Sequence, residues 1–132
     1  MRAKTQTTKR SASEVPRAEA RATPRLRIKI GDGLILGPGK IDLLDAIVRT
    51  GSISAAAREM DMSYRRAWLL VDEMNQMFDA PLVAAAPGGV RGGGAEVTPL
   101  GEAVAAAYRR IVKRTQAAIG EELSRIAKDK SS

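Results

Sequence analysis

The side chains best suited to chemistry in this sequence are hydroxyls and guanidiniums near its middle. Six of them stand at or near the starts of two segments with apolar patterning: Ser52, Ser54, Ser63, Tyr64, Arg65 and Arg66. Hydroxyls and free backbone N–H groups at helix N-termini suit phosphate oxygens, and arginines form forked hydrogen bonds with phosphate or guanine. These residue types therefore favour binding of phosphate groups over catalysis.

The chemistry that the sequence lacks points the same way. Its 132 residues include no cysteine and no histidine. This excludes a disulfide framework, a thiol nucleophile and the commonest general base and metal ligand. No paired carboxylates or cofactor fingerprint stand in a recognisable motif. We therefore expect a protein that is not an enzyme and that has no cofactor and no metal site.

A helix over residues 40–50 is predicted by apolar residues three and four positions apart. Its expected inward face is Ile41, Leu44, Ile47 and Val48. Gly37-Pro38-Gly39 before this helix indicates a loop, and Gly51 after it suits a left-handed C-cap. This helix therefore ends just before the segments that carry the hydroxyls and guanidiniums.

Two further helices follow with very little chain between them. Ser52 can cap a helix that runs to about Met60, and after a break at 61–62 Ser63 can cap another. With its cap, this last helix spans 63–77. Two short helices joined by a tight turn form a helix-turn-helix pattern, whose second helix enters the major groove of DNA. The pattern predicts that residues 63–77 are a recognition helix.

Short strands are expected on both sides of the helices. The strand candidates are 26–30, 34–36, 82–86 and 95–97. The Gly-rich stretch 87–94 lies between the last two and contains Arg91, a cation that would touch the DNA backbone. This stretch lacks the residue spacing of a phosphate-binding loop before a helix. It is therefore interpreted as the tip of a wing.

A long final helix is predicted after Thr98-Pro99, which suits an N-cap followed by a first-turn proline. The helix runs to about Ala127, and its apolar residues include Val104, Tyr108, Ile111, Ile119, Leu123 and Ile126. This stripe can be ordinary core or the seam of a dimer. The seam is favoured, because the stripe is longer than a small core can cover.

Most of the excess positive charge lies in the first 25 residues. The whole chain carries +7, whereas residues 1–25 hold seven basic and two acidic residues and residues 26–132 hold 15 and 13. The first segment has no apolar periodicity, so we expect a disordered basic tail, either a solvated appendage or an arm that adds sequence-independent DNA affinity. No apolar run approaches the length of a membrane span. We expect a cytoplasmic protein.

A specific resemblance supports this interpretation. The stretch from Gly51 to Trp68 resembles the DNA-binding region of ModE-type molybdenum-dependent transcriptional regulators, which are related to the LysR class. Asp72-Glu73-Met74-Asn75, the Gly-rich tip and Thr98-Pro99-Leu100-Gly101 continue the match, which covers about residues 26–125. The resemblance implies a winged helix-turn-helix that dimerises and binds palindromic double-stranded DNA. It also implies molybdate-binding domains after the long helix, and since the chain stops at Ser132 we expect a stand-alone DNA-binding version.

The expected fold is mainly α with a small β wing: a winged helix-turn-helix over 26–132 with a long C-terminal dimerisation helix, preceded by the tail over 1–25. The expected function is that of a homodimeric transcriptional regulator that reads a palindromic site with recognition helix 63–77 and wing 87–94. The alternative is a winged-helix module that modulates another regulator without reading DNA. A separate effector or sensor protein is a further expected partner.

Overall fold

The computed structural model describes residues 22–87 and 94–131. The chain divides into two compact units, one of Arg25–Ile111 and one that joins the segment up to Pro24 with Val112–Ser132. The tail predicted over 1–25 lies almost wholly outside the described residues and stays a prediction. The expected site residues all belong to the first unit, apart from Arg91, which lies outside the described residues.

Three helices form the body of this unit: α2 (Pro38–Thr50), α3 (Ile53–Glu59) and α4 (Tyr64–Met77). The bounds of α4 are those that the sequence predicts. Helix α2, however, begins two residues earlier than predicted, so the loop expected at Gly37-Pro38-Gly39 is wrong. Pro38 is the first helical residue, where its missing N–H costs nothing and its fixed φ suits a helix.

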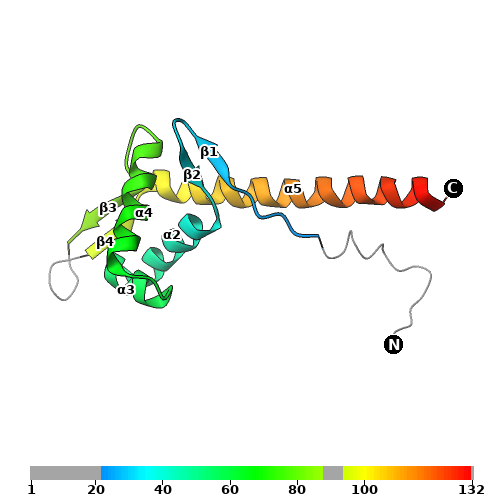
Figure 1. Cartoon of the computed structure of the whole chain (residues 1–132). Coiled ribbons are helices and arrows are strands. Elements are labelled where there is room, and N and C mark those ends of the chain that lie inside the picture. Colours follow the sequence, from blue (N-terminus) through cyan, green and yellow to red (C-terminus); the bar gives the residue numbers. More distant parts are fainter. Residues whose placement is uncertain (1–21, 88–93, 132) are drawn as a thin grey trace, which may run out of the picture. The chain divides into compact units, whose positions relative to one another are not determined.

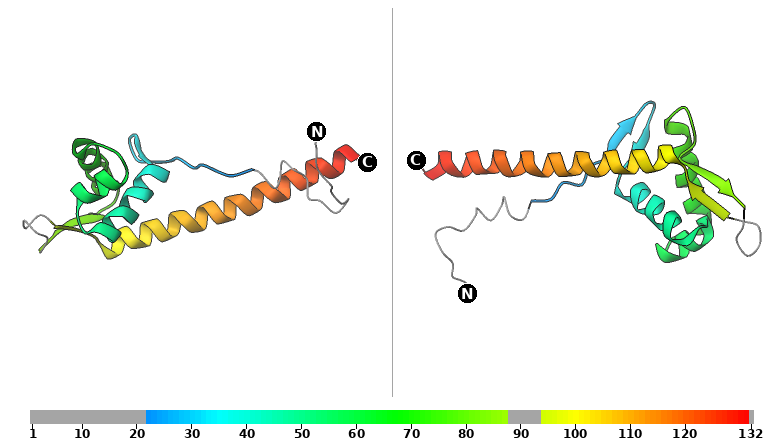
Figure 2. Two further views of the ribbon diagram at one scale, coloured as in Figure 1. Left: turned by 90° about the horizontal axis from the view of Figure 1, so that it is seen from below. Right: turned by 180° about the vertical axis from the view of Figure 1, so that it is seen from behind.

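Two antiparallel hairpins pack against the helices (Figure 1). Strand β1 (Ile28–Ile30) pairs with β2 (Leu34–Leu36), and β3 (Val83–Ala86) pairs with β4 (Gly94–Val97). Helix α4 contacts a strand of each hairpin. Figure 2 shows the strands β3 and β4 running outward from the three helices. This hairpin is therefore placed as a wing beside the helix-turn-helix.

The core of the unit is mostly aliphatic. Its most completely buried large side chains are Leu43, Leu44, Ile47, Val71, Met74 and Leu82. Val48, which was expected in the inward face of α2, is 59% exposed, whereas Leu43 is fully buried. The other residues of the predicted face, Ile41, Leu44 and Ile47, are buried as expected. Helix α2 is covered on more than one side, by α3, α4 and β4, so its buried face also includes Leu43.

Helix α5 (Pro99–Ser131) closes the described chain and runs through both units. The Thr98 hydroxyl accepts a hydrogen bond from the Gly101 N–H at 3.0 Å, which confirms the predicted cap. In the first unit, the buried Tyr108 hydroxyl donates to the Leu26 carbonyl at 2.7 Å. Burial raises the pKa of this phenol above its ordinary value, although the Arg25 charge lowers it.

The predicted fold class is confirmed: the structure is mainly helical, with a β wing after a helix-turn-helix and a long C-terminal helix. In the second unit, the Gln116 side-chain amide donates a hydrogen bond to the Ala22 carbonyl at 2.8 Å. Across the described residues, none of the helices is both long and apolar enough to span a bilayer.

Candidate nucleic-acid interface

Each helix of the helix-turn-helix begins with a serine whose hydroxyl caps it. The Ser52 hydroxyl accepts from the Ala55 N–H at 2.9 Å and begins α3, and the Ser63 hydroxyl accepts from the Arg66 N–H at 3.0 Å and begins α4. Between the helices, Asp61 adopts a φ of 56°, a left-handed conformation that a short polar side chain tolerates. Both predicted caps are therefore confirmed, and Ser63 sets the start of α4.

The two arginines at the start of α4 extend into solvent. Arg65 and Arg66 are both exposed, and within the described residues neither guanidinium has a hydrogen-bond or ion-pair partner. Successive helical residues point about 100° apart, so Arg65 lies opposite the buried stripe that contains Ala67 and Met74, and Arg66 lies toward one flank. Arg65 is therefore placed to meet a base edge, and Arg66 is better placed for a phosphate.

The serines keep a hydrogen to donate. A hydroxyl that accepts a bond from a backbone N–H still carries its own proton, so Ser52 and Ser63 can cap their helices and donate to a phosphate oxygen. Ser54 is exposed and accepts from the Arg58 guanidinium at 3.0 Å. Arg58 was not predicted from the sequence, although its spacing of four residues from Ser54 on one helix could have indicated it.

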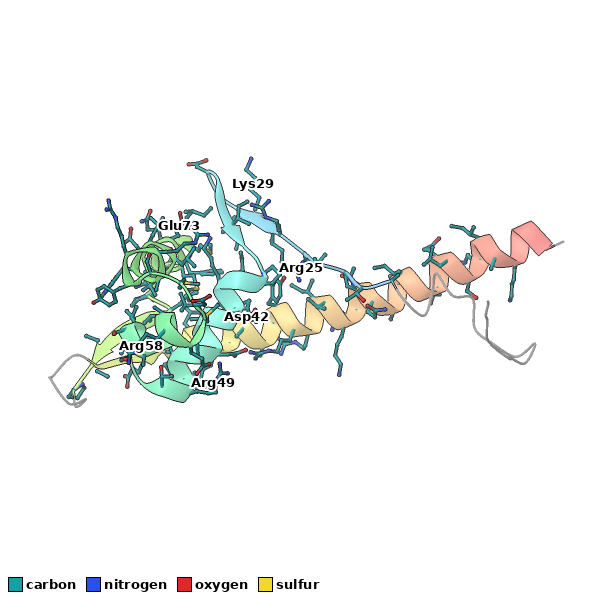
Figure 3. All side chains as sticks on the ribbon, turned by 60° about the horizontal axis from the view of Figure 1, so that its bottom comes forward. Arg25, Lys29, Asp42, Arg49, Arg58 and Glu73 are labelled. Carbon is teal, nitrogen blue, oxygen red and sulfur yellow. The ribbon has the colours of Figure 1, made fainter. Side chains whose placement is uncertain are left out.

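Arg58 lies on the outer side of α3, as Arg49 does on α2 (Figure 3). The Arg49 guanidinium pairs with Glu59, and this hydrogen bond raises the pKa of Arg49 above its ordinary value. Arg49 is thus engaged in joining α2 to α3. Arg58 has a hydroxyl partner rather than a carboxylate, so its positive charge stays available to an anion.

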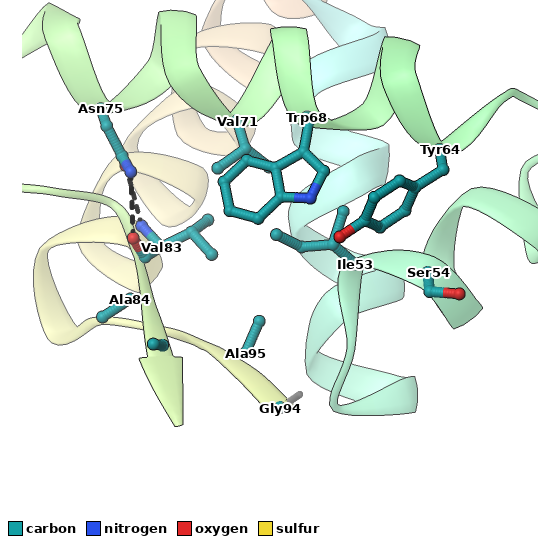
Figure 4. Close-up of a pocket in the computed structure, with 11 residues that line it drawn as sticks. Ile53, Ser54, Tyr64, Trp68, Val71, Asn75, Val83, Ala84, Gly94 and Ala95 are labelled. Atoms are coloured by element: carbon teal, nitrogen blue, oxygen red, sulfur yellow. Dashed lines mark hydrogen bonds between the residues drawn. The ribbon is translucent and has the colours of Figure 1, made fainter. Parts of the chain in front are cut away.

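Tyr64 and Trp68 form an aromatic pair on α4. Their ring centroids lie 6.3 Å apart at an interplanar angle of 83°, an edge-to-face contact. Both rings point from α4 toward Ile53 on α3 (Figure 4). They line a largely apolar recess of about 460 Å³ between α3, α4 and the β3–β4 hairpin. Tyr64 therefore packs on Trp68, and its 55% exposure also leaves it accessible to DNA.

The base of the wing is attached to α4 by the side chain of Asn75. Its Oδ1 accepts from the Leu82 N–H at 2.8 Å and from the Val83 N–H at 3.0 Å, and its Nδ2 donates to the Val83 carbonyl at 3.0 Å. The Ala95 N–H donates to the Gly51 carbonyl at 2.9 Å, which fixes the second strand. The wing predicted over 87–94 thus has a defined base, but residues 88–93, Arg91 included, lie outside the described residues.

An Asn75→Ala variant is expected to lower the free energy of unfolding by about 2 kcal/mol, because it leaves three half-buried backbone groups without their partners. Chemical denaturation followed by circular dichroism measures this change. Gln76→Ala is the matched control, since Gln76 is exposed and donates to the Asp72 side chain on the same helix. Equal stability of the two variants would contradict a structural role for the Asn75 amide.

Lys40 makes a second attachment of α4, one that sequence reasoning missed. It is only 8% exposed, and its ammonium donates to the Ile35 carbonyl at 2.6 Å and pairs with Glu73 at 2.9 Å. It thereby joins β2, α2 and α4. A lysine near a helix start and an asparagine within a helix both resemble surface residues in a sequence, so neither signals that it is buried against a distant segment.

Comparison with known proteins agrees with this arrangement. Residues 39–102 match the family model of bacterial regulatory helix-turn-helix proteins of the lysR family. The molybdenum-pterin-binding protein MopB of Rhodobacter capsulatus is 56% identical over 79 residues, 60% of this chain and 29% of that protein. The molybdenum transport protein ModE of Azotobacter vinelandii is 38% identical over 95 residues, 72% of this chain and 35% of that protein.

A further relative is named as a DNA-binding transcriptional regulator. The DNA-binding transcriptional dual regulator ModE of Escherichia coli (strain K12) is 38% identical over 93 residues, 70% of this chain and 36% of that protein. The chain therefore spans about a third of the length of these relatives. The matched part contains both helices of the helix-turn-helix and the described base of the wing. Residues 39–102 are thus similar to the helix-turn-helix domain of the lysR family of bacterial regulatory proteins, and the chain is similar to relatives named ModE over about 70% of its own length.

Proposed function

We propose that the protein is a transcriptional regulator that binds double-stranded DNA in a sequence-specific manner. The observation that carries this proposal is the pair of exposed guanidiniums of Arg65 and Arg66 on the first turn of α4, the second helix of the helix-turn-helix. The DNA-binding role printed for the Escherichia coli relative supports the same function. The protein binds rather than turns over a substrate.

In this proposal α4 enters the major groove and the β3–β4 hairpin lies beside it as the wing. Ser52, Ser54 and Ser63 contact phosphates close to the N-termini of α3 and α4, and Arg58 adds a charge that the sequence pattern did not indicate. Arg91 contacts the backbone from the wing tip. The tail over 1–25 supplies an electrostatic contribution that does not depend on sequence.

The protein acts as a homodimer on a palindromic site. In support of this, α5 has 33 residues and keeps apolar side chains partly or largely exposed, among them Ile119, Leu123 and Ile126. A second copy of the chain can cover such a stripe. Two recognition helices related by a two-fold axis then meet half-sites about one helical turn apart, or a multiple of it. A separate effector or sensor protein regulates the dimer.

Selection from a random DNA library tests the proposal. The full chain is incubated with duplexes that contain a randomised core, and bound duplexes are recovered, amplified and sequenced over several rounds. We expect one enriched motif, arranged as an inverted repeat. Selection in parallel at low and high salt separates sequence-specific binding from phosphate attraction, because the latter falls steeply with salt.

Each outcome of the selection has a distinct meaning. An enriched inverted repeat supports the dimeric regulator, and an enriched motif without symmetry supports DNA recognition but contradicts the dimer. A pool without any shared sequence contradicts sequence-specific recognition. That result would favour the alternative, a winged-helix module that modulates another regulator through protein contacts.

A further inference from the structure

Three large apolar side chains remain exposed on the first two turns of α4. Tyr64, Trp68 and Leu69 are 55%, 45% and 50% exposed, and we refer to them as the apolar strip. An amphipathic helix normally places charged or polar side chains opposite its buried stripe. A contiguous apolar surface in solvent, by contrast, commonly marks a binding surface.

The apolar strip lies beside the charges of the proposed interface. Trp68 lines the recess toward the β3–β4 hairpin and also a shallower one on the outer surface of α4. Leu69, Arg65 and Arg66 line that second recess as well. Trp68 and Leu69 therefore share one recess with the two arginines and with the acidic Asp72.

The chemistry of the major groove offers one match for this surface. Base edges there present hydrogen-bond donors and acceptors, and the C5-methyl group of thymine is their one apolar feature. The side chain of Leu69 has no polar atom to offer such an edge, and that of Trp68 has only its indole N–H donor. The apolar surface of each gains free energy when a methyl group covers it. The guanidinium of Arg65, between Tyr64 and Trp68 in sequence, meets the polar edges.

We propose that Trp68 and Leu69 are specificity-determining residues that contact thymine C5-methyl groups, while Tyr64 holds the Trp68 ring through its edge-to-face contact. This inference rests on the proposed DNA-binding function and adds what the interface selects. The recognised half-site contains thymines at the positions that face Trp68 and Leu69, next to the base that Arg65 contacts. An apolar surface of a protein partner is the other occupant that such a strip could have.

Substitution of deoxyuridine for thymidine tests the inference on the unmodified protein. The exchange removes only the C5-methyl group and leaves the Watson–Crick pair and the phosphate charge in place. Each thymine of the selected site is replaced singly, and binding is measured by fluorescence anisotropy. We expect about fourfold weaker binding for each methyl group that the strip contacts.

Variants then assign the methyl groups to side chains. In Leu69→Gln, and separately in Trp68→Gln, the replacements that weaken binding of the unmodified protein should lose their effect at the methyl that the missing side chain contacted. Gln76→Ala, exposed on the last turns of α4, should keep the full set of losses. Because the first measurement needs no variant, instability of Trp68→Gln does not compromise the test.

Failure of the inference differs from failure of the proposed function. If the chain selects a DNA motif but no deoxyuridine weakens its binding, the protein recognises DNA and the inference is wrong. Losses that persist in both glutamine variants overturn it too, since other atoms then contact the methyl groups. A chain that selects no motif overturns the proposed function, and the inference falls with it.

Discussion

A Gly101→Ala variant is expected to lower the free energy of unfolding by about 3 kcal/mol, close to the limit usually seen for overpacking a buried site. Gly101 lies in the first turn of α5 and is buried against the base of the wing. A Cβ there would lie 2.6 Å from Cγ1 of Val97, and closer still to the Leu82 carbonyl oxygen. Real Cβ atoms essentially never approach other atoms so closely, so helix or hairpin must move.

Neither neighbour of Gly101 can move without breaking other contacts. The Leu82 carbonyl accepts a hydrogen bond from the Thr98 N–H at 2.9 Å, and the Leu82 side chain is fully buried. A shift of α5 would separate Thr98, its cap, from Leu82. The substitution therefore disrupts hydrogen bonds and packing at the joint between α5 and the wing.

Thermal unfolding followed by circular dichroism measures the effect, and a decrease in Tm of roughly 10–20 °C is expected for a unit of this size. Gly39→Ala is the matched control. Gly39 is exposed within α2, and the position that a Cβ would take there is open space, so alanine should raise stability by about 0.5 kcal/mol through helix propensity. A Gly101→Ala protein as stable as the control would show that the joint is not close-packed.

Replacement of both Arg65 and Arg66 by alanine is expected to weaken binding to the selected DNA site about 100-fold, or about 2.7 kcal/mol. A guanidinium that forms a forked hydrogen bond with guanine contributes about 1–3 kcal/mol to discrimination between bases. Both guanidiniums are exposed and unpaired within the described residues. The fold should be unaffected, because neither side chain packs in the core. Anisotropy titrations against the selected duplex measure the loss.

The two single variants should have different effects on DNA binding. Arg65→Ala should relax sequence preference, since Arg65 lies opposite the core of α4, whereas Arg66→Ala should weaken all duplexes alike and reduce the salt slope by about one. Arg110→Ala on α5 is the matched control, an exposed arginine outside the proposed interface. Two single variants with identical losses on specific and random DNA would contradict this division, and unchanged affinity of the double variant would contradict direct readout by α4.

The parts of this fold that were predictable are those governed by local chemistry. Ser63 and the apolar residues of the recognition helix defined both ends of α4, because a cap and a periodic stripe act within one segment. The C-cap at Gly51, with φ of 78°, was predictable for the same reason. The start of α2 was missed because Gly37-Pro38-Gly39 suits both a loop and a proline-initiated helix, and only packing decides between them.

The polar attachments of α4 could not be predicted. Lys40 and Asn75 act on residues that fold beside them rather than on their own helices, so no spacing in the chain reveals them. Val48 was misplaced because α2 is covered from several directions. The arginines and serines of the candidate site were chosen from residue type and position, and their contact with DNA stays a prediction. Trp68 and Leu69 were not assigned to it, since exposure of an apolar side chain is visible only once the core is known.

The two attachments of α4 have a consequence for how such a domain can acquire new targets. Glu73 and Asn75, which connect α4 to Lys40 and to the wing, lie on its third and fourth turns, whereas the side chains that we propose to contact DNA lie on its first two. The proposed DNA contacts and the contacts that anchor α4 in the fold thus lie on different turns of the same helix. If α4 binds DNA as proposed, substitutions at Arg65 or Leu69 should change the recognised sequence without loosening the helix, which would make α4 a starting point for designing regulators of altered specificity.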